Sequence, residues 1–134
     1  MKHDTPSPCP DRTKKTGIAH LWAATRHSAN GLKAMTGETA FRHELLAACL
    51  ILPAAWLLPF PLWQAMLLSL LWGAVLVVET LNTALEAVVD LASPGYHPLA
   101  KKAKDLGSAA VGLSLALNVL AWGLSLWLLD AGSE

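Results

Sequence analysis

Charge and cysteine are scarce in this 134-residue sequence, and no familiar nucleotide-binding loop is present. Charged residues make up only 15% of the chain, and none occurs from Leu45 to Val78. The formal net charge is zero, so nothing favours binding to nucleic acid. Cys9 and Cys49 form neither a CxxC motif nor a His-Cys cluster, which argues against a disulfide framework or a zinc site. The absence of GxxxxGK[ST] and GxGxxG excludes the usual phosphate-binding loops.

Hydrophobic residues are abundant instead. They make up 54% of the chain, and the mean hydropathy of +0.42 is higher than a soluble domain of this size needs. Six Trp against one Tyr and two Phe is typical of proteins with side chains at a membrane–water boundary. The uncharged stretch is too long for one crossing, which takes about 20 residues. Pro59 and Pro61 divide it, which predicts a tight hairpin between two membrane helices.

We therefore expect an all-α membrane protein, a bundle of three transmembrane helices with an N-terminal amphipathic helix at the interface. Apolar residues recur at helical spacing from Ile18 to Met35, opposite a basic face, which predicts the interfacial helix. The alternative for this segment is an ordinary surface helix on a soluble core. The expected spans are 39–58, with Pro53 as a kink, 62–91 and 98–129. Residues 1–16 are expected to form a disordered basic leader, and 17–134 a single membrane-embedded domain.

The positive residues predict the topology. Lys and Arg occur only in the first forty-odd residues and in the cluster Lys101, Lys102 and Lys104. By the positive-inside rule, the N-terminus and the loop between the second and third spans face the cytoplasm. Both segments then lie on the side of the membrane where ATP is available.

The strongest functional signal is a row of polar residues in the second span. Glu79, Asn82, Glu86 and Asp90 are three or four residues apart, so they fall within about 80° on one helix face. Ionisable residues inside a membrane are costly and usually functional. Three carboxylates on one face suit a magnesium site, since Mg²⁺ takes one or two carboxylates and keeps its other positions for water and phosphate. The alternative is a solvated extension of the helix, which fits Asp90 well and Glu79 badly.

Residues near the start of the first and third spans could complete such a site. Glu38 and Glu44 are either boundary charges or part of it. The basic cluster could serve only to orient the chain in the membrane. Asp105, directly after Lys104, argues against that interpretation, and a lysine is a point-charge partner for phosphates. Tyr96 and His97 could contact a purine or a phosphate, although their spacing alone does not favour either role.

Three segments, 38–44, 79–90 and 103–111, strongly resemble prokaryotic diacylglycerol kinase, and the resemblance covers about Gly17 to Leu129. It implies a homotrimer in the bacterial cytoplasmic (inner) membrane, with active sites shared between neighbouring subunits. The implied reaction is Mg²⁺-dependent transfer of the ATP γ-phosphate to the hydroxyl of diacylglycerol, giving phosphatidic acid.

The resemblance also implies roles for individual residues. Glu79 would be the general base, Glu38 and Glu86 the magnesium ligands, and Asn82 and Asp90 supporting residues. The implied ATP contacts are His20, His27, Glu38, Glu86, Gly95, Tyr96, His97, Lys104 and Asp105. The implied lipid-substrate contacts are Ala40, Phe41, Arg42, His43, Glu44, Glu79 and Ser108.

The chain departs from the family pattern in its N-terminal helix. His20 stands where the family commonly has Arg, and His27 where Tyr is common, so the nucleotide contacts of this helix are the least certain to transfer. Three alternatives stay open at this point. A related branch phosphorylates undecaprenol, a small oligomeric ion or proton transporter would explain Glu79 and Glu86, and a non-catalytic assembly factor would tolerate apolar replacements along the polar row.

Overall fold

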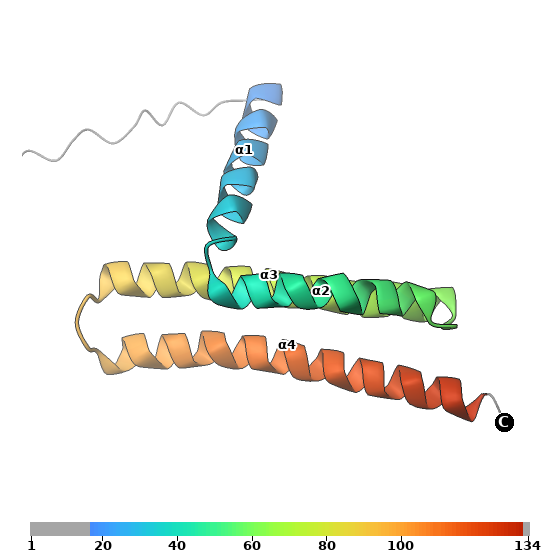
Figure 1. Ribbon diagram of the computed structural model, residues 1–134. Helices are drawn as coiled ribbons and strands as arrows, with labels where there is room; N and C mark the ends of the chain where they lie inside the picture. Colours follow the sequence, from blue (N-terminus) through green and yellow to red (C-terminus); the bar gives the residue numbers. More distant parts are fainter. Residues whose placement is uncertain (1–16, 133–134) are drawn as a thin grey trace, which may run out of the picture. The chain divides into compact units, whose positions relative to one another are not determined.

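The computed structural model describes residues 17–132, except the side chain of Ala19, and these residues form four α-helices and no strand (Figure 1). The helices are α1 (Ile18–Met35), α2 (Thr39–Leu57), α3 (Leu62–Ala92) and α4 (Pro98–Ala131). The all-α prediction is confirmed, and each expected helix ends within a turn of its observed end. The expected leader, residues 1–16, lies outside the described residues.

The helix α1 belongs to a separate part of the chain that ends at Ala34. Its apolar side chains, among them Ile18, Trp22 and Leu32, are exposed to solvent. An isolated helix that exposes an apolar stripe needs a surface to cover it. Its position at a membrane interface stays a prediction.

The helices α2, α3 and α4 are long and apolar enough to cross a membrane by length and composition. Large side chains such as Leu50, Leu70, Leu113 and Val119 are exposed along them. A soluble bundle would bury these side chains, whereas lipid tails are as apolar as leucine.

The helix ends follow from local sequence. The chain reverses between α2 and α3 at residues 58–61, where Pro59 and Pro61 break the helix. It reverses again after Ala92, since Ser93 precedes a proline and adopts φ −139°, outside the helical region. Pro98 then occupies the first turn of α4, where its missing N–H leaves no bond unmade.

The second part of the chain, from Met35 onward, packs around α3, which contacts both α2 and α4 (Figure 1). Leu68 and Val75 of α3 are fully buried in this core. The end of α3 and the start of α4 lie at the same end of the bundle, because the loop of residues 93–97 joins them. The helix α2 has 19 residues against 31 in α3, so α2 begins beside the middle of α3 (Figure 1). On these three helices, the charged residues predicted for the site lie in the half of the bundle away from residues 58–61.

Hydrogen bonds in the apolar part of the bundle help to tie the membrane helices together. The Trp56 indole Nε1 on α2 donates to Ser69 Oγ on α3 at 3.0 Å. The Asn118 amide on α4 donates to the Leu71 carbonyl on α3 at 3.0 Å. Hydrogen bonds between helices stabilise packing in lipid, where the apolar side chains supply little driving force.

Candidate active site

The polar row on α3 passes from buried to exposed along the helix. Glu79 is only 5% exposed, Asn82 and Glu86 are half-buried, and Asp90 near the helix end is exposed. The Asn82 amide Nδ2 donates to Glu86 Oε1 one turn further on, at 3.4 Å. The prediction that Glu79 faces the inside of the bundle is confirmed, and the solvated-extension alternative holds only for Asp90.

The start of α2 brings more carboxylates to this row. Glu38 is the N-cap residue of α2 and is exposed, while Glu44, nearly two turns on, is buried at 7% exposure. The Glu79 carboxylate is near enough to those of Glu38 and Glu86 to interact with them electrostatically. Glu44 interacts with Glu79 in the same way. Glu79 thus interacts electrostatically with Glu38, Glu44 and Glu86, and neighbouring negative charges favour a cation beside them.

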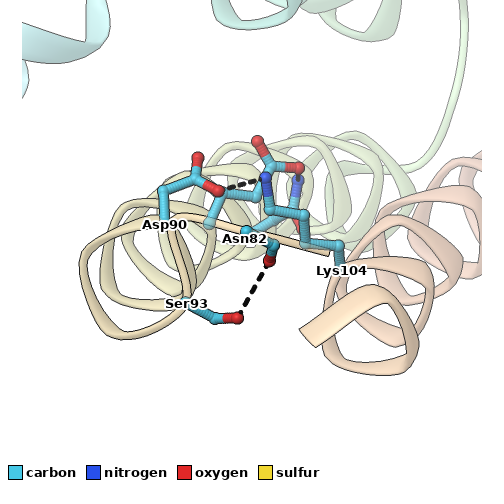
Figure 2. A network of polar contacts seen from close by, with 6 residues as sticks. Asn82, Asp90, Ser93 and Lys104 are labelled. Carbon is cyan, nitrogen blue, oxygen red and sulfur yellow. Dashed lines mark hydrogen bonds and ion pairs between the residues drawn. The ribbon is translucent and has the colours of Figure 1, made fainter. Parts of the chain in front are cut away.

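The helix α4 contributes a cation close to the end of the row. Lys104 Nζ lies 2.6 Å from Asp90 Oδ1, and the two side chains are 39% and 65% exposed. Figure 2 shows Lys104 reaching from α4 to Asp90, with Asn82 about two turns before Asp90 on α3. The sequence placed these residues at the same membrane surface, but it did not predict that they pair.

The helices α3 and α4 approach each other closely at Gly107. A Cβ atom on Gly107 would collide with Asn82 Oδ1 and would lie 3.2 Å from Leu85 Cδ2. The expectation that a small residue permits close helix approach is confirmed here. Asn82 Oδ1 is buried and has no hydrogen-bond partner among the described residues.

A cavity of ≈ 270 Å³ lies at the loop that joins α3 to α4. Its lining comprises Val89, Asp90, Ser93, Gly95, Tyr96, His97, Ala100, Lys101, Lys104 and Asp105. This lining includes every residue of the loop region for which the family resemblance implies an ATP contact. The Ser93 hydroxyl donates to the Gly95 carbonyl at 3.1 Å, which holds the turn closed (Figure 2).

His97 and Asp105 already have structural partners in this cavity. The His97 Nδ1 accepts a hydrogen bond from the Leu99 N–H at 3.2 Å and so caps the N-terminus of α4. This leaves the Nε2 side of the neutral ring as a donor. Asp105 Oδ2 pairs with Lys101 Nζ at 2.6 Å, one turn earlier on α4.

Some predicted site residues are not brought to these groups. The side chains of Ala40, Arg42, His43 and Ser108 are exposed, whereas Phe41 of the same α2 segment is buried. His20 and His27 lie on α1, in the other part of the chain. The lipid contacts of the first group and the nucleotide contacts of the two histidines stay predictions.

A second polar cluster lies near the middle of the bundle, and the sequence analysis missed it. Asn118 is 3% exposed and its Oδ1 has no partner, and the Nε1 atoms of buried Trp72 and half-buried Trp122 also have none, within residues 17–132. All three residues line an apolar cavity of ≈ 540 Å³. The signal was available, because Asn118 is the one side-chain amide between residues 106 and 129, and such residues usually face a neighbouring helix.

Comparison with known proteins identifies the family. The family model described as "Prokaryotic diacylglycerol kinase" matches residues 26–126, most of the chain. The chain belongs to the prokaryotic diacylglycerol kinase family.

The diacylglycerol kinases that it resembles come from several bacteria. The Haemophilus influenzae protein named diacylglycerol kinase is 40% identical over 111 residues, covering 82% of this chain and 94% of that protein. The Escherichia coli K12 protein of the same name is 40% identical over 114 residues, covering 84% and 93%. The Pseudomonas aeruginosa protein is 39% identical over 117 residues, covering 87% and 94%. Together with the three apolar helices, this membership makes the chain a multi-pass membrane protein.

The donor groups of this diacylglycerol kinase family member fit a magnesium ion supplied with its nucleotide. The part of the chain that the structure describes has no group of three or more His, Cys, Asp or Glu residues arranged as a metal site. Mg²⁺ does not need one, because it takes one or two carboxylates and completes its coordination with phosphate and water oxygens. Glu38, Glu79 and Glu86 offer only oxygen donors and interact electrostatically. Such a set suits a hard cation better than a transition metal.

Proposed function

We propose that this chain transfers the γ-phosphate of ATP to the hydroxyl of a 1,2-diacylglycerol and so produces phosphatidic acid. The proposal rests on one coincidence. This chain of the diacylglycerol kinase family has a buried carboxylate, Glu79, on one face of α3. On the same face, Asp90 pairs with Lys104, the candidate lysine for phosphate binding. Phosphoryl transfer depends on positioning and on charge neutralisation more than on covalent help from the protein.

Glu79 is the general base in this proposal. Its side chain is buried in the bundle, at 5% exposure. It accepts the hydroxyl proton while the lipid oxygen attacks the γ-phosphorus in line. Glu44, which is also buried and interacts with Glu79, belongs to the lipid side of the site, with Ala40, Phe41, Arg42, His43 and Ser108.

The loop cavity holds the nucleotide. Lys104 donates to phosphate oxygens, and Asp105 adds a second charged contact. Gly95, Tyr96 and His97 enclose the rest of the nucleotide. His97 can take part only through its Nε2 or its ring face, since its Nδ1 caps α4.

Glu38 and Glu86 would hold the Mg²⁺ that accompanies ATP. When bound there, the ion neutralises the charge that develops on the transferring phosphoryl group. Asn82 keeps Glu86 oriented through their hydrogen bond at 3.4 Å. Asp90 supports the site from the other side of Glu86.

The assembly and its membrane orientation are part of the same proposal. The active chain is a homotrimer with active sites shared between subunits, in the bacterial inner membrane, with the N-terminus in the cytoplasm. His20 and His27 on α1 then contact the nucleotide. The distribution of Lys and Arg supports this orientation, because these residues occur in the sequence only up to the start of the first span and between the second and third spans.

The family relatives favour diacylglycerol over undecaprenol, since the proteins from H. influenzae, E. coli and P. aeruginosa are named diacylglycerol kinases. A transporter does not account for Lys104 pairing with Asp90 beside a loop cavity.

The test is transfer of labelled phosphate from Mg·ATP to each lipid in mixed micelles. Diacylglycerol and undecaprenol are offered separately to the purified full chain, with a lipid-free reaction to measure ATP hydrolysis alone. We expect labelled phosphatidic acid and much slower labelling of undecaprenol. Preferential labelling of undecaprenol would change the substrate, and transfer to neither lipid would refute the kinase proposal.

A further inference from the structure

Asp90 and Lys104 pair across two helices, which distinguishes them from the other ion pair beside the loop cavity. Lys104 Nζ on α4 lies 2.6 Å from Asp90 Oδ1 on α3. Lys101 and Asp105 are one turn apart on α4, so their pair does not connect two helices. Both members of the Asp90–Lys104 pair line the loop cavity.

The pair has little to offer as a stabilising contact. Both side chains are more than a third exposed, and exposed ion pairs contribute little to folding. A lysine ammonium ends a flexible four-carbon stem, which must be ordered before it can hold a phosphate. A fixed partner therefore affects where the ammonium lies more than it affects stability.

We propose that Asp90 is a positioning residue, which fixes the Lys104 ammonium at the wall of the loop cavity so that it meets the phosphates of an incoming nucleotide. A lysine ammonium has three N–H donors, so its bond to Asp90 leaves two for phosphate oxygens. The inference deepens the proposed function and rests on it, because it assigns Asp90 a specific task in that site.

The same contact separates Asp90 from the magnesium-binding carboxylates. Asp90 follows Glu86 by one turn on the polar row, and spacing alone makes it an equal candidate for a metal ligand. An ammonium at 2.6 Å, however, occupies one oxygen of its carboxylate and repels a divalent cation. The row on α3 is thus graded. Glu79 interacts with the other carboxylates, Glu86 interacts with both Glu79 and Lys104, and Asp90 makes the direct contact with the lysine.

The experiment measures KM for Mg·ATP and kcat for diacylglycerol phosphorylation in Asp90→Asn, which keeps the shape and removes the charge. We expect KM to rise about fivefold, the upper end of what an exposed ion pair contributes, with kcat within about twofold of wild type. Asp90→Glu restores the carboxylate, so its KM should lie between the two. The matched control is Asp130→Asn, the same change at the opposite end of α4, which should leave both constants unchanged.

A reversed pair separates positioning from a structural role. Asp90→Lys combined with Lys104→Asp should keep the wild-type unfolding temperature in detergent but raise KM, because the ammonium now starts from the wrong helix. If Asp90→Asn does not fold, this double variant decides the question alone. A wild-type KM in the reversed pair, or in Asp90→Asn, would overturn the inference. Absence of phosphate transfer by the wild type would instead refute the proposed function itself.

Discussion

Replacing Gly107 with alanine tests whether the contact between α3 and α4 supports the site. The added Cβ would collide with Asn82 Oδ1 and press on Leu85 Cδ2 at 3.2 Å. Asn82 must then turn away from Gly107, and its 3.4 Å hydrogen bond to Glu86 is lost or strained. The perturbation therefore reaches a proposed magnesium ligand without altering any charged residue.

The magnitude follows from two opposing contributions. Alanine is favoured over glycine in a helix interior by about 1 kcal/mol. Overpacking costs about 1–3 kcal/mol, because the side chains of Asn82 and Leu85 must move. The matched control is Gly112→Ala, five positions further along α4, where an added Cβ meets nothing within 4 Å. Both variants gain the same helix propensity, so Gly107→Ala should be less stable than Gly112→Ala by about 1–3 kcal/mol.

Stability is measured by unfolding in mixed detergent micelles, and activity by phosphate transfer to diacylglycerol at saturating ATP. We expect Gly107→Ala to lose activity beyond what its unfolded fraction explains, and Gly112→Ala to keep it. Asn82→Ala combined with Gly107→Ala should recover stability, since the colliding amide is gone, but not activity. Equal stability and activity in the two glycine variants would refute the reasoning.

Three further predictions concern the helix end and the membrane core. His97→Ala should destabilise the start of α4 by about 1 kcal/mol and His97→Asn should not, because asparagine can cap the helix in its place; thermal unfolding in detergent measures both. Asn118→Ala should cost about 0.6–1.7 kcal/mol through loss of its bond to the Leu71 carbonyl, as measured by detergent-induced unfolding, and no loss would contradict that bond's role. Trp56→Phe should lower the free energy of unfolding by a similar small amount. Adding Ser69→Ala should lower it no further, because both changes remove the same hydrogen bond, as a double-mutant cycle would show.

The fold was accessible from sequence because each signal for it is local. Proline, alone or after serine, can end a helix whatever the rest of the chain does. The length of an apolar run is enough to predict a membrane span. The structure confirms that residues 58–61 and 93–97 connect the helices. The helix bounds consequently differ from expectation by less than a turn.

The site was accessible only in part, because its contacts join residues far apart in the chain. Spacing predicted that Glu79, Asn82, Glu86 and Asp90 share a face, since one helix determines it. It could not predict that Asp90 pairs with Lys104, which depends on how α3 and α4 pack after the loop. Position along the span did predict that Glu79 is shielded and Asp90 is solvated, and the structure confirms both.

Two residues have contacts that the sequence does not show. The family resemblance implies that His97 contacts the nucleotide, and the structure adds a capping bond that uses its Nδ1. Asn118 lies in the third span and drew no prediction from the sequence, yet its amide joins α4 to α3. In both cases the function of a polar atom depends on the nearest backbone group, which the sequence does not show.

The measurement that tests the central claim most directly is phosphate transfer from Mg·ATP to diacylglycerol by Glu79→Gln beside the wild type. Glutamine keeps the size and polarity of the buried side chain but cannot accept the proton. We predict that kcat falls by about 10²–10⁴-fold, the usual contribution of a general base, while the unfolding transition and KM for ATP change little. A variant that retains wild-type kcat would contradict the assignment of Glu79 as the base of this lipid kinase.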